Sequence, residues 1–316
     1  MPNVKSTARD ITHDGQRPAA PQVFDMAKRH IRRERAANRF NATSTLAFFS
    51  QRCAEDIAER LLDIARTFQN ALIIAPPGFW PHVAGLLPAA KHPKNITTCY
   101  DLPDSTETRG RIEITAPDDA LPFDPESFDL IISILSLHSV NDLPGALINM
   151  RQCLKPDGLM MASLFGGQSL NELRQSLYSA EANITGGVTP RVFPMIDFSQ
   201  SAALLQRAGL ALPVVDTDRF TVQYSSFDRL INDLRDQGET NILAAASGAP
   251  ISKPLRDELI TAYTAHSQHT EQKLTTTFEI LWLTGWAPDA SQQKPLKPGS
   301  AKMRLADALG AKEQKL

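Results

Sequence analysis

Two spacings of apolar residues alternate along the chain, and each predicts its own kind of element. Between Cys53 and Phe68, apolar side chains recur every three or four positions, which is typical of an amphipathic helix. The run 71–75 is short and apolar and ends at a loop of proline and glycine, which favours a buried strand. The run 127–137 is largely apolar, as expected for a central parallel strand covered on both faces. On these grounds we expect strands at 71–75, 96–100, 111–115, 127–137, 158–165, 214–224 and 275–286.

Helical spacing fills the gaps between several of these strands. Residues 142–154 place apolar side chains on one face of a helix, and we expect that helix to stop at 155–158, which contains a proline and a glycine. Because strands alternate with helices through the first half, the pattern predicts right-handed βαβ units, a parallel sheet and the α/β fold class. The other expected helices lie at 199–208, 226–237 and 254–270, with a basic helix starting at Phe24.

The composition limits the class of protein. Of the 316 residues, 42% are hydrophobic and 22% are charged, which is ordinary for a globular chain and excludes a disordered or fibrous one. The length favours one large domain with extensions. A net charge of −2 gives no reason to expect nucleic acid as a partner. Apolar stretches reach only about ten residues, half of what a bilayer-spanning helix needs, so no membrane span is expected.

Cysteine, histidine and acidic residues bear on the compartment and on metals. The cysteines at 53, 99 and 153 are widely spaced and form no zinc or disulfide pattern, which suits a reducing cytosol. His266 and His269 lie three apart on an expected helix without an acidic third ligand, so no metal site is expected. Asp10 and Asp14 count against an organelle presequence. We therefore expect a soluble, cytoplasmic protein.

Composition also divides the chain into parts. Residues 1–40 contain nine basic and four acidic side chains. This excess leaves two interpretations of the basic helix at 28–35, as a docking arm for an acidic partner or for phosphates, or as a solvated helix face. The expected parts are a flexible tail at 1–22, N-terminal helices at 23–69, a sheet domain with helical insertions at 70–287 and a polar C-terminal tail at 288–316.

Candidate site residues follow the ends of the expected strands, because ligands of open α/β sheets bind beyond the carboxyl ends of the strands. Asp101 follows the second strand, where a carboxylate can accept hydrogen bonds from ribose hydroxyls, although aspartate is also a common turn residue. Ser136 and His138 follow the central strand, and His138 is a candidate base or hydrogen-bond donor. Its alternative role is a structural one, with the ring bonded to a loop carbonyl.

Several fragments carry a family resemblance. The chain is similar to class I S-adenosylmethionine-dependent methyltransferases in the fragments ALPFDPESFDLIIS, LHSVNDLPGAL and LKPDGLMMASLFGG. Within that class, it resembles the mitochondrial complex I assembly factor 5 family and its α-proteobacterial relatives across residues 23–309. More distantly it resembles the malonyl-carrier-protein methyltransferase of biotin synthesis. The fragments of the narrower resemblance are FDMAKRHIRRERAA, FGGQSLNELRQSL, AGLALPVVDTD, DLRDQGETN and PLKPGSA.

The resemblance implies a fold and a function. The implied fold is a seven-stranded Rossmann-like sheet with its last strand antiparallel, helices on both faces and a helical cover over the cleft. The implied activity is methyl transfer from S-adenosylmethionine to a protein or small-molecule acceptor. The alternative is an assembly factor for a respiratory complex I subunit, either non-catalytic or an arginine hydroxylase, as the mitochondrial member is described.

The sequence departs from this class at the loop after the first strand. Class members carry three glycines there, whereas the stretch Ala75–Pro81 holds one, Gly78. Pro76 and Pro77 remove two N–H donors that would meet the cofactor's carboxylate. Losing two or three such hydrogen bonds, at roughly 1.5–3 kcal/mol each, would weaken binding by a few powers of ten. We also expect Phe79 and Trp80 to add bulk where the methionine part of the cofactor would lie.

A second departure concerns the cofactor's adenine. The acidic residue that faces the adenine amino group in the class falls at Pro117, which leaves Asp118 or Asp119 as substitutes. Asp101, by contrast, fits the ribose-binding position. The resemblance therefore implies a half-retained S-adenosylmethionine site formed by Pro77, Gly78, Asp101, Asp118, Asp119 and Ser136, with Ser136 and His138 as catalytic candidates.

Overall fold

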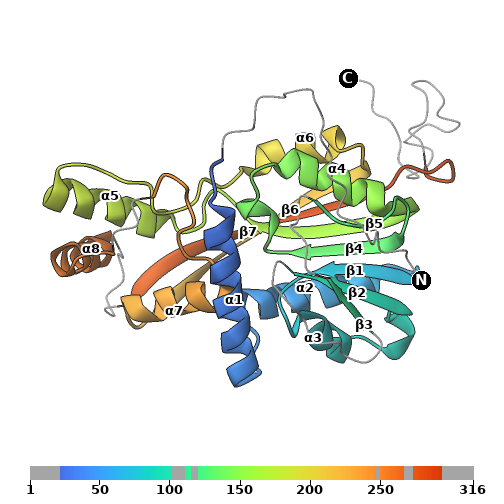
Figure 1. Ribbon diagram of the computed structural model, residues 1–316, viewed down its shortest axis with the longest axis horizontal. Helices are drawn as coiled ribbons and strands as arrows, with labels where there is room; N and C mark the ends of the chain where they lie inside the picture. Colours follow the sequence, from blue (N-terminus) through green and yellow to red (C-terminus); the bar gives the residue numbers. More distant parts are fainter. Residues whose placement is uncertain (1–21, 101–110, 115–119, 247–249, 267–272, 294–316) are drawn as a thin grey trace, which may run out of the picture.

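The computed structural model describes residues 22–100, 111–114, 120–246, 250–266 and 273–293 (Figure 1). Most of the two expected tails lies outside these ranges. The strands are β1 (Asn70–Ile74), β2 (Asn95–Cys99), β3 (Arg111–Ile114), β4 (Phe128–Ile134), β5 (Leu154–Phe165), β6 (Ala211–Tyr224) and β7 (Leu274–Trp286). The helices are α1 (Met26–Thr43), α2 (Phe48–Asp63), α3 (Phe79–Leu86), α4 (Leu143–Cys153), α5 (Asn171–Thr185), α6 (Phe198–Arg207), α7 (Phe227–Gln237) and α8 (Lys253–His266), with short 3-10 turns η1 (Ala89–Lys91) and η2 (Leu137–Ser139).

The strands form one mixed sheet in the order β3-β2-β1-β4-β5-β7-β6. Every residue of β4 is buried, as its apolar run predicts, and β4 pairs in parallel with both β1 and β5. β7 runs antiparallel to both of its neighbours. The expected α/β, Rossmann-like class is therefore confirmed. The strand order reverses between β1 and β4, and a ligand cleft is expected at the carboxyl ends of these two strands.

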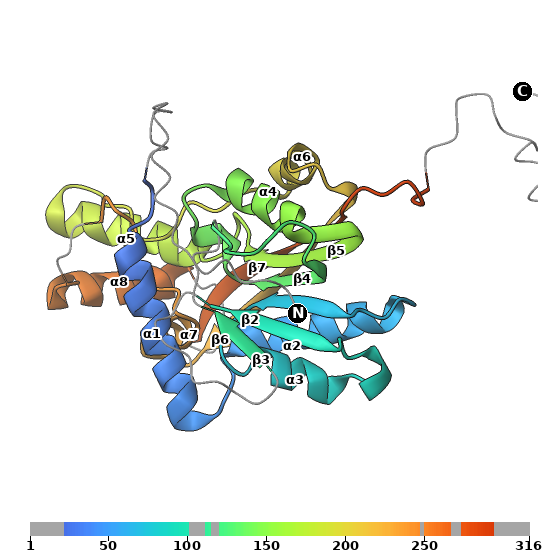
Figure 2. The same cartoon turned by 45° about the vertical axis from the view of Figure 1, so that its right-hand side comes forward.

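Helices cover both faces of the sheet (Figures 1 and 2). On one face, α4 and α6 pack against alternate residues such as Leu72 and Ile131. On the other face, α2, α3 and α7 pack against the intervening residues, such as Ile73 and Ile132. The alternation follows from strand geometry, in which successive side chains point to opposite faces. Helix α1, dark blue in Figure 1, covers neither face and crosses the sheet near the ends of its central strands.

The start of β5 corrects one expectation from the sequence. The helix α4 ends at Cys153 as expected, but β5 begins directly at Leu154 rather than after the 155–158 turn. Leu154 pairs with Phe128, and the register of the two strands shifts before the next pair. Asp157 has φ 57°, a value more usual for glycine. The proline and glycine of this stretch therefore produce an irregular strand end instead of a loop.

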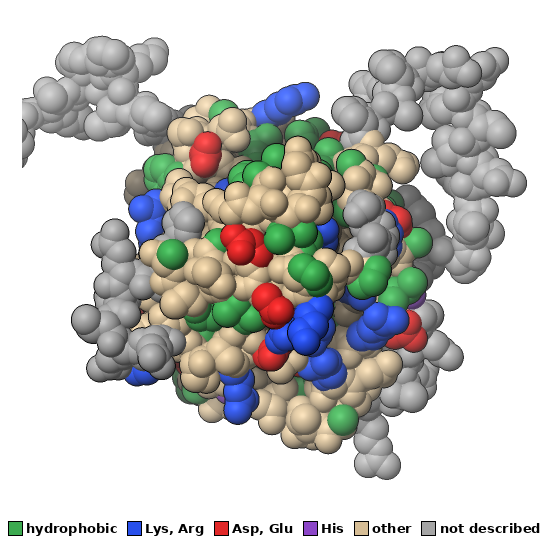
Figure 3. Space-filling view, turned by 90° about the vertical axis from the view of Figure 1, so that its left-hand side faces the viewer, with side chains coloured by type: hydrophobic (Ala, Val, Ile, Leu, Met, Phe, Trp, Pro, Cys, Tyr) green, Lys and Arg blue, Asp and Glu red, His purple; other side chains and the backbone are tan. Residues whose placement is uncertain are grey.

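The surface carries charged side chains of both signs (Figure 3), as the near-zero net charge suggests. Acidic and basic side chains lie close together on the face that α5 and α8 present in Figure 3. One such pair is Arg256 and Asp228, whose side chains are 2.8 Å apart. Among the described residues, no helix is long and apolar enough to cross a bilayer.

Candidate functional site

The loop after β1 contains Gly78, the single glycine where the methyltransferase class carries three. Gly78 is the N-cap of α3 and has φ 82°, a conformation that favours glycine. A Cβ atom at this position would lie 2.2 Å from Cζ of Phe40, which comes from the last turns of α1. Gly78 is thus required for the backbone conformation and for the close approach of α1 to the loop.

The expectation about the two aromatic residues of this loop is wrong. Phe79 and Trp80 are buried in the hydrophobic core that α2 and α3 share, so neither side chain fills the cofactor position. The reason is that α3 begins at Phe79, and its first turn faces the core. Pro76 and Pro77 instead line a cavity of about 610 Å³, together with the end of α1, the start of α2 and α7. The loop lacks N–H donors, but it leaves space beside it.

Two arginines of α1 reach the end of β4. Arg29 donates from Nε to Ser139 Oγ (3.0 Å) and from Nη2 to the Ser136 carbonyl (3.1 Å). Arg33 donates from Nη2 to Ser136 Oγ (2.6 Å), and its Cζ lies 5.1 Å from the centre of the Tyr100 ring at the end of β2. Both guanidinium groups are buried. Helix α1 therefore brings two positive charges and several donors to the edge where the proline loop lacks them.

Two interpretations of the basic helix came from the sequence, a docking arm and a solvated face. Neither fits Arg29 and Arg33, because both side chains are buried and bonded to residues at the end of β4. A signal was present in the sequence, because Arg29, Arg33, Ala36, Ala37 and Phe40 recur at helical spacing. The first four of these positions are the buried residues of α1. The pattern was missed because arginine counts as polar in an amphipathic helix.

His138, on η2, points toward the turn that follows α7. Its Nε2 lies 2.8 Å from Oε2 of Glu239, and its ring packs edge-on against Phe165 and stacks near Phe193. Nδ1 is buried and has no hydrogen-bond partner among the described residues. A doubly protonated ring would leave that second N–H unsatisfied, so the geometry favours the tautomer with one proton, on Nε2. The ring therefore bonds to a carboxylate, and the alternative of a histidine bonded to a loop carbonyl does not hold.

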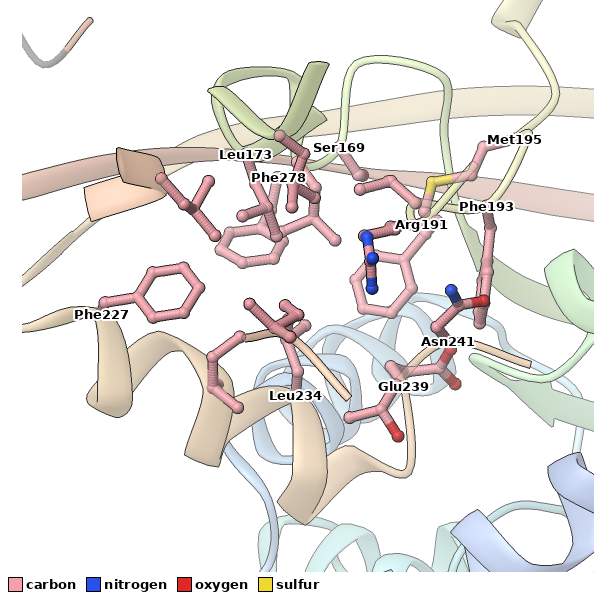
Figure 4. Close-up of a pocket in the computed structure, with 18 residues that line it drawn as sticks. Ser169, Leu173, Arg191, Phe193, Met195, Phe227, Leu234, Glu239, Asn241 and Phe278 are labelled. Carbon is pink, nitrogen blue, oxygen red and sulfur yellow. The ribbon is translucent and has the colours of Figure 1, made fainter. Parts of the chain in front are cut away.

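Glu239 lines an apolar pocket of about 180 Å³, shown in Figure 4 and called the inner pocket below. The turn that carries it starts at Gly238, the C-cap of α7, whose φ of 82° directs the chain back toward β4. The pocket is built from the end of β5, α5, the 191–195 segment, α7, α8 and β7. Its aromatic walls are Phe165, Phe193, Phe227 and Phe278.

Arg191 also lines the inner pocket, but its charge is matched by a carboxylate. Its Nε lies 2.5 Å from Oε1 of Glu181, and Glu181 accepts two further hydrogen bonds from the backbone N–H and hydroxyl of Thr189. Burial would raise the pKa of Glu181, but the hydrogen bonds from Thr189 and Arg191 outweigh burial and lower it. With Arg191 neutralised in this way, Glu239 leaves the pocket with a net negative charge.

Three of the expected site residues, Asp101, Asp118 and Asp119, lie outside the described residues, and their roles stay predictions. His266 ends α8, and its neighbour at 269 is not described. Within the described ranges, no group of three histidine, cysteine or acidic side chains could hold a metal ion. The thiol of Cys53 is no nucleophile, because burial raises its pKa to about 12.

Ser136 and His138 were selected from sequence because both follow a strand end, and their roles stay predictions. No role was expected for Glu239, Glu181 or Arg191. Glu181 lies in α5 and the other two lie between elements, all far along the chain from β4, so no local pattern joins them to His138. A signal for Glu239 existed in the fragment DLRDQGETN, which carried the narrower resemblance without a chemical role.

Comparison with known proteins places the chain among methyltransferase relatives. A methyltransferase domain family matches residues 96–162. The mitochondrial arginine-hydroxylase NDUFAF5 of Danio rerio is 32% identical over 298 residues, which cover 90% of this chain and 89% of that protein. The human protein of the same name is 32% identical over 297 residues, covering 92% and 84%. The malonyl-[acyl-carrier protein] O-methyltransferase of Laribacter hongkongensis is 28% identical over 279 residues, covering 83% and 91%.

Proposed function

The chain belongs to the NDUFAF5 family, a branch of the class I S-adenosylmethionine-dependent methyltransferases, and from this premise we propose that it modifies an arginine side chain of a protein client. The observation that carries the proposal is the Glu239 carboxylate, which lies in a largely apolar pocket and is held by His138. A guanidinium group fits such a site, because it pairs with carboxylates and stacks on aromatic rings.

The cofactor is S-adenosylmethionine, which supplies a methyl group on a sulfonium centre when bound. The residues at the sheet edge fit it. The cavity beside Pro76 and Pro77 leaves room, and Arg29 and Arg33 hold Ser136 at the neighbouring strand end. In the proposal, Ser136 and the loop of Pro77 and Gly78 line the cofactor. Asp101 binds its ribose, and Asp118 or Asp119 faces its adenine.

In the proposal, Glu239 binds the acceptor arginine and His138 orients Glu239. One oxygen of Glu239 accepts from His138 Nε2, so the carboxylate is fixed in orientation and the other oxygen is left for the guanidinium. As a guanidinium nitrogen gains a substituent it loses a proton, and Glu239 is the group placed to accept it. His138 acts as the positioning residue, because its hydrogen bond fixes the orientation of the Glu239 carboxylate.

A second candidate reaction is hydroxylation of the same arginine, favoured by the printed name of the relatives, arginine-hydroxylase. Under this alternative the inner pocket orients the same side chain. Inserting one oxygen atom from O2 releases one water molecule, so both O2 and a two-electron reductant must be supplied to the chain. The client is then a subunit of respiratory complex I that is modified on the cytoplasmic side during assembly. A purely structural assembly role uses the same pocket for binding alone.

Mass spectrometry separates these possibilities. The protein is incubated with S-adenosylmethionine and the capped peptide Ala-Leu-Arg-Leu-Ala, with a lysine peptide as control. We expect the arginine peptide to gain a methyl group, whereas gain of one oxygen would identify hydroxylation. Glu239→Gln should lower product formation about tenfold or more, since a charged hydrogen bond is lost. Modification of the lysine peptide alone, or full turnover by Glu239→Gln, would contradict the proposal.

A further inference from the structure

A second cavity, of about 620 Å³, lies next to the inner pocket and is called the outer groove here. Its walls come from the start of the described chain at Gln22 and Val23, from α5, from the segment 190–195 and from the turn after α7. The volume is within the range of ordinary ligand cavities. The fragment FGGQSLNELR contributes to both cavities, with Phe165 in the inner pocket and with Gly167 and Arg174 in the outer groove.

The outer groove and the inner pocket share one wall. Val192, Phe193 and Met195 line both cavities, so a single segment of chain separates them. That segment is fixed in place, because Arg174 donates from Nη2 to the Phe193 carbonyl and the Phe193 ring packs edge-on against Phe24. A ligand in the outer groove therefore lies directly beside the site proposed for the arginine.

Gly167 allows the floor of the outer groove to form. Its N–H donates to the Ile196 carbonyl at 3.0 Å, and a Cβ atom at Gly167 would lie 2.4 Å from Oδ1 of Asp197. A side chain at Gly167 would displace Asp197 from the groove.

The lining is mainly apolar, with charged groups at its margin. Val23 and Tyr178 are 40% and 44% exposed, although both are large and hydrophobic. Pro190 and Pro194 add further exposed apolar surface, and Arg174 and Asp197 supply one charge of each sign. Clustered exposed apolar side chains with a polar margin are typical of a surface that binds another chain.

We infer that the outer groove binds the extended segment of the protein client that flanks the target arginine, with an apolar residue seated against Val23 and Tyr178. The inference rests on the proposed function for the position of the arginine in the inner pocket. Continuity with that pocket favours a peptide over a small molecule, because one extended chain can fill both cavities, with alternate side chains directed into them. The apolar lining selects an apolar neighbour for the arginine, and the paired charges leave no preference for a strongly acidic or basic segment.

The test compares two probes by calorimetry on the full chain. The affinity for N-acetyl-arginine amide measures binding to the inner pocket alone. The affinity for capped Ala-Leu-Arg-Leu-Ala measures binding to both cavities. We expect the peptide to bind about tenfold more tightly than the single residue, because leucine becomes buried in the groove. The double variant Val23→Ser, Tyr178→Ala should abolish that gain and leave the affinity of the single residue unchanged. Both positions are exposed, so folding should be retained, and Ile184→Ala, an exposed position on the same helix α5, is the matched control.

The outcomes separate the two proposals. Equal affinities for the two probes, or a peptide gain that survives the double variant, would overturn the groove inference and leave the arginine pocket standing. A peptide gain seen equally with lysine in place of arginine, and lost in the double variant, would support the groove while contradicting the arginine proposal. If removal of residues 1–21 alone raised the affinity for the peptide, the chain's own N-terminal segment would be the occupant and the inference would be wrong.

Discussion

The two halves of the candidate site are built in different ways. The proposed cofactor half lies where β1 and β4 end, beside one helix, α1, that crosses them. The proposed acceptor half lies around Glu239 and is lined by the end of β5, α5, the 191–195 segment, α7, α8 and β7. In the first half, proline replaces a backbone donor in the loop, and α1 holds Ser136 through Arg29 and Arg33. The first half thus depends on the neighbours of two strand ends, whereas the second depends on segments far apart along the chain.

The largest effect is expected at the contact between α1 and the loop after β1, where Gly78 lies against Phe40. Gly78→Ala should lower the free energy of unfolding by about 2–4 kcal/mol, since the new Cβ adds left-handed strain and collides with Phe40. Chemical denaturation measures the change.

Gly85→Ala is the matched control, because Gly85 lies in α3, the helix that Gly78 caps, and no atom lies within 4 Å of a Cβ at that position. That control should leave stability unchanged or raise it by about 0.5–1 kcal/mol. Equal losses in the two variants would show that α1 does not depend on Gly78.

A second, smaller effect is expected at Arg33. Arg33→Met removes a charge-assisted hydrogen bond to Ser136 and should cost about 1.5–3 kcal/mol of stability. It should also weaken S-adenosylmethionine binding about tenfold, because Arg33 holds Ser136, which is proposed to line the cofactor. Calorimetry with the cofactor measures the second quantity separately from denaturation.

Arg35→Met serves as control, because Arg35 lies on the exposed side of α1. It should change stability by no more than about 0.5 kcal/mol. The same cofactor affinity in both variants would remove Arg33 from the cofactor half of the site.

The smallest effect concerns the wall of the acceptor half. The pKa of Glu181 lies below its usual 4.5, so its charged form stabilises the folded protein above that pH and the stabilisation is lost as the pH falls. Glu181→Gln should therefore lower the free energy of unfolding by about 1–2 kcal/mol at pH 7 and by much less in acid.

Denaturation curves at several pH values test this dependence, with the exposed Glu59→Gln as reference. A loss of stability that stays constant from pH 7 into acid would mean that the charge of Glu181 does not hold Arg191 in the pocket wall.

The fold was predictable from sequence where a pattern is local. The largely apolar run at 127–137 identified β4, and alternating strands and helices identified the class. The start of β5 was not predictable, because proline and glycine at 155–158 are typical of a turn and only pairing with β4 makes them part of a strand. The resemblance supplied the antiparallel last strand, which the run at 275–286 alone does not reveal.

The candidate site was predictable only where it follows a strand end. Ser136 and His138 were selected in this way and their roles stay predictions, whereas Phe79 and Trp80 were misplaced because the phase of a helix start is not visible in sequence. Glu239 could not be identified from sequence, since 101 positions separate it from His138 and their contact depends on how α7 packs against α1. Nothing in the spacing of residues near either partner encodes that contact.

The central claim is that Glu239 recognises a guanidinium group beside His138. Calorimetric titration with N-acetyl-arginine amide tests it directly in the wild-type protein and in Glu239→Gln, with Glu59→Gln as control. We predict measurable binding to the wild type and the control, and a loss of about tenfold or more in Glu239→Gln. Identical affinity in all three proteins, or equal binding of N-acetyl-lysine amide by the wild type, would contradict the account.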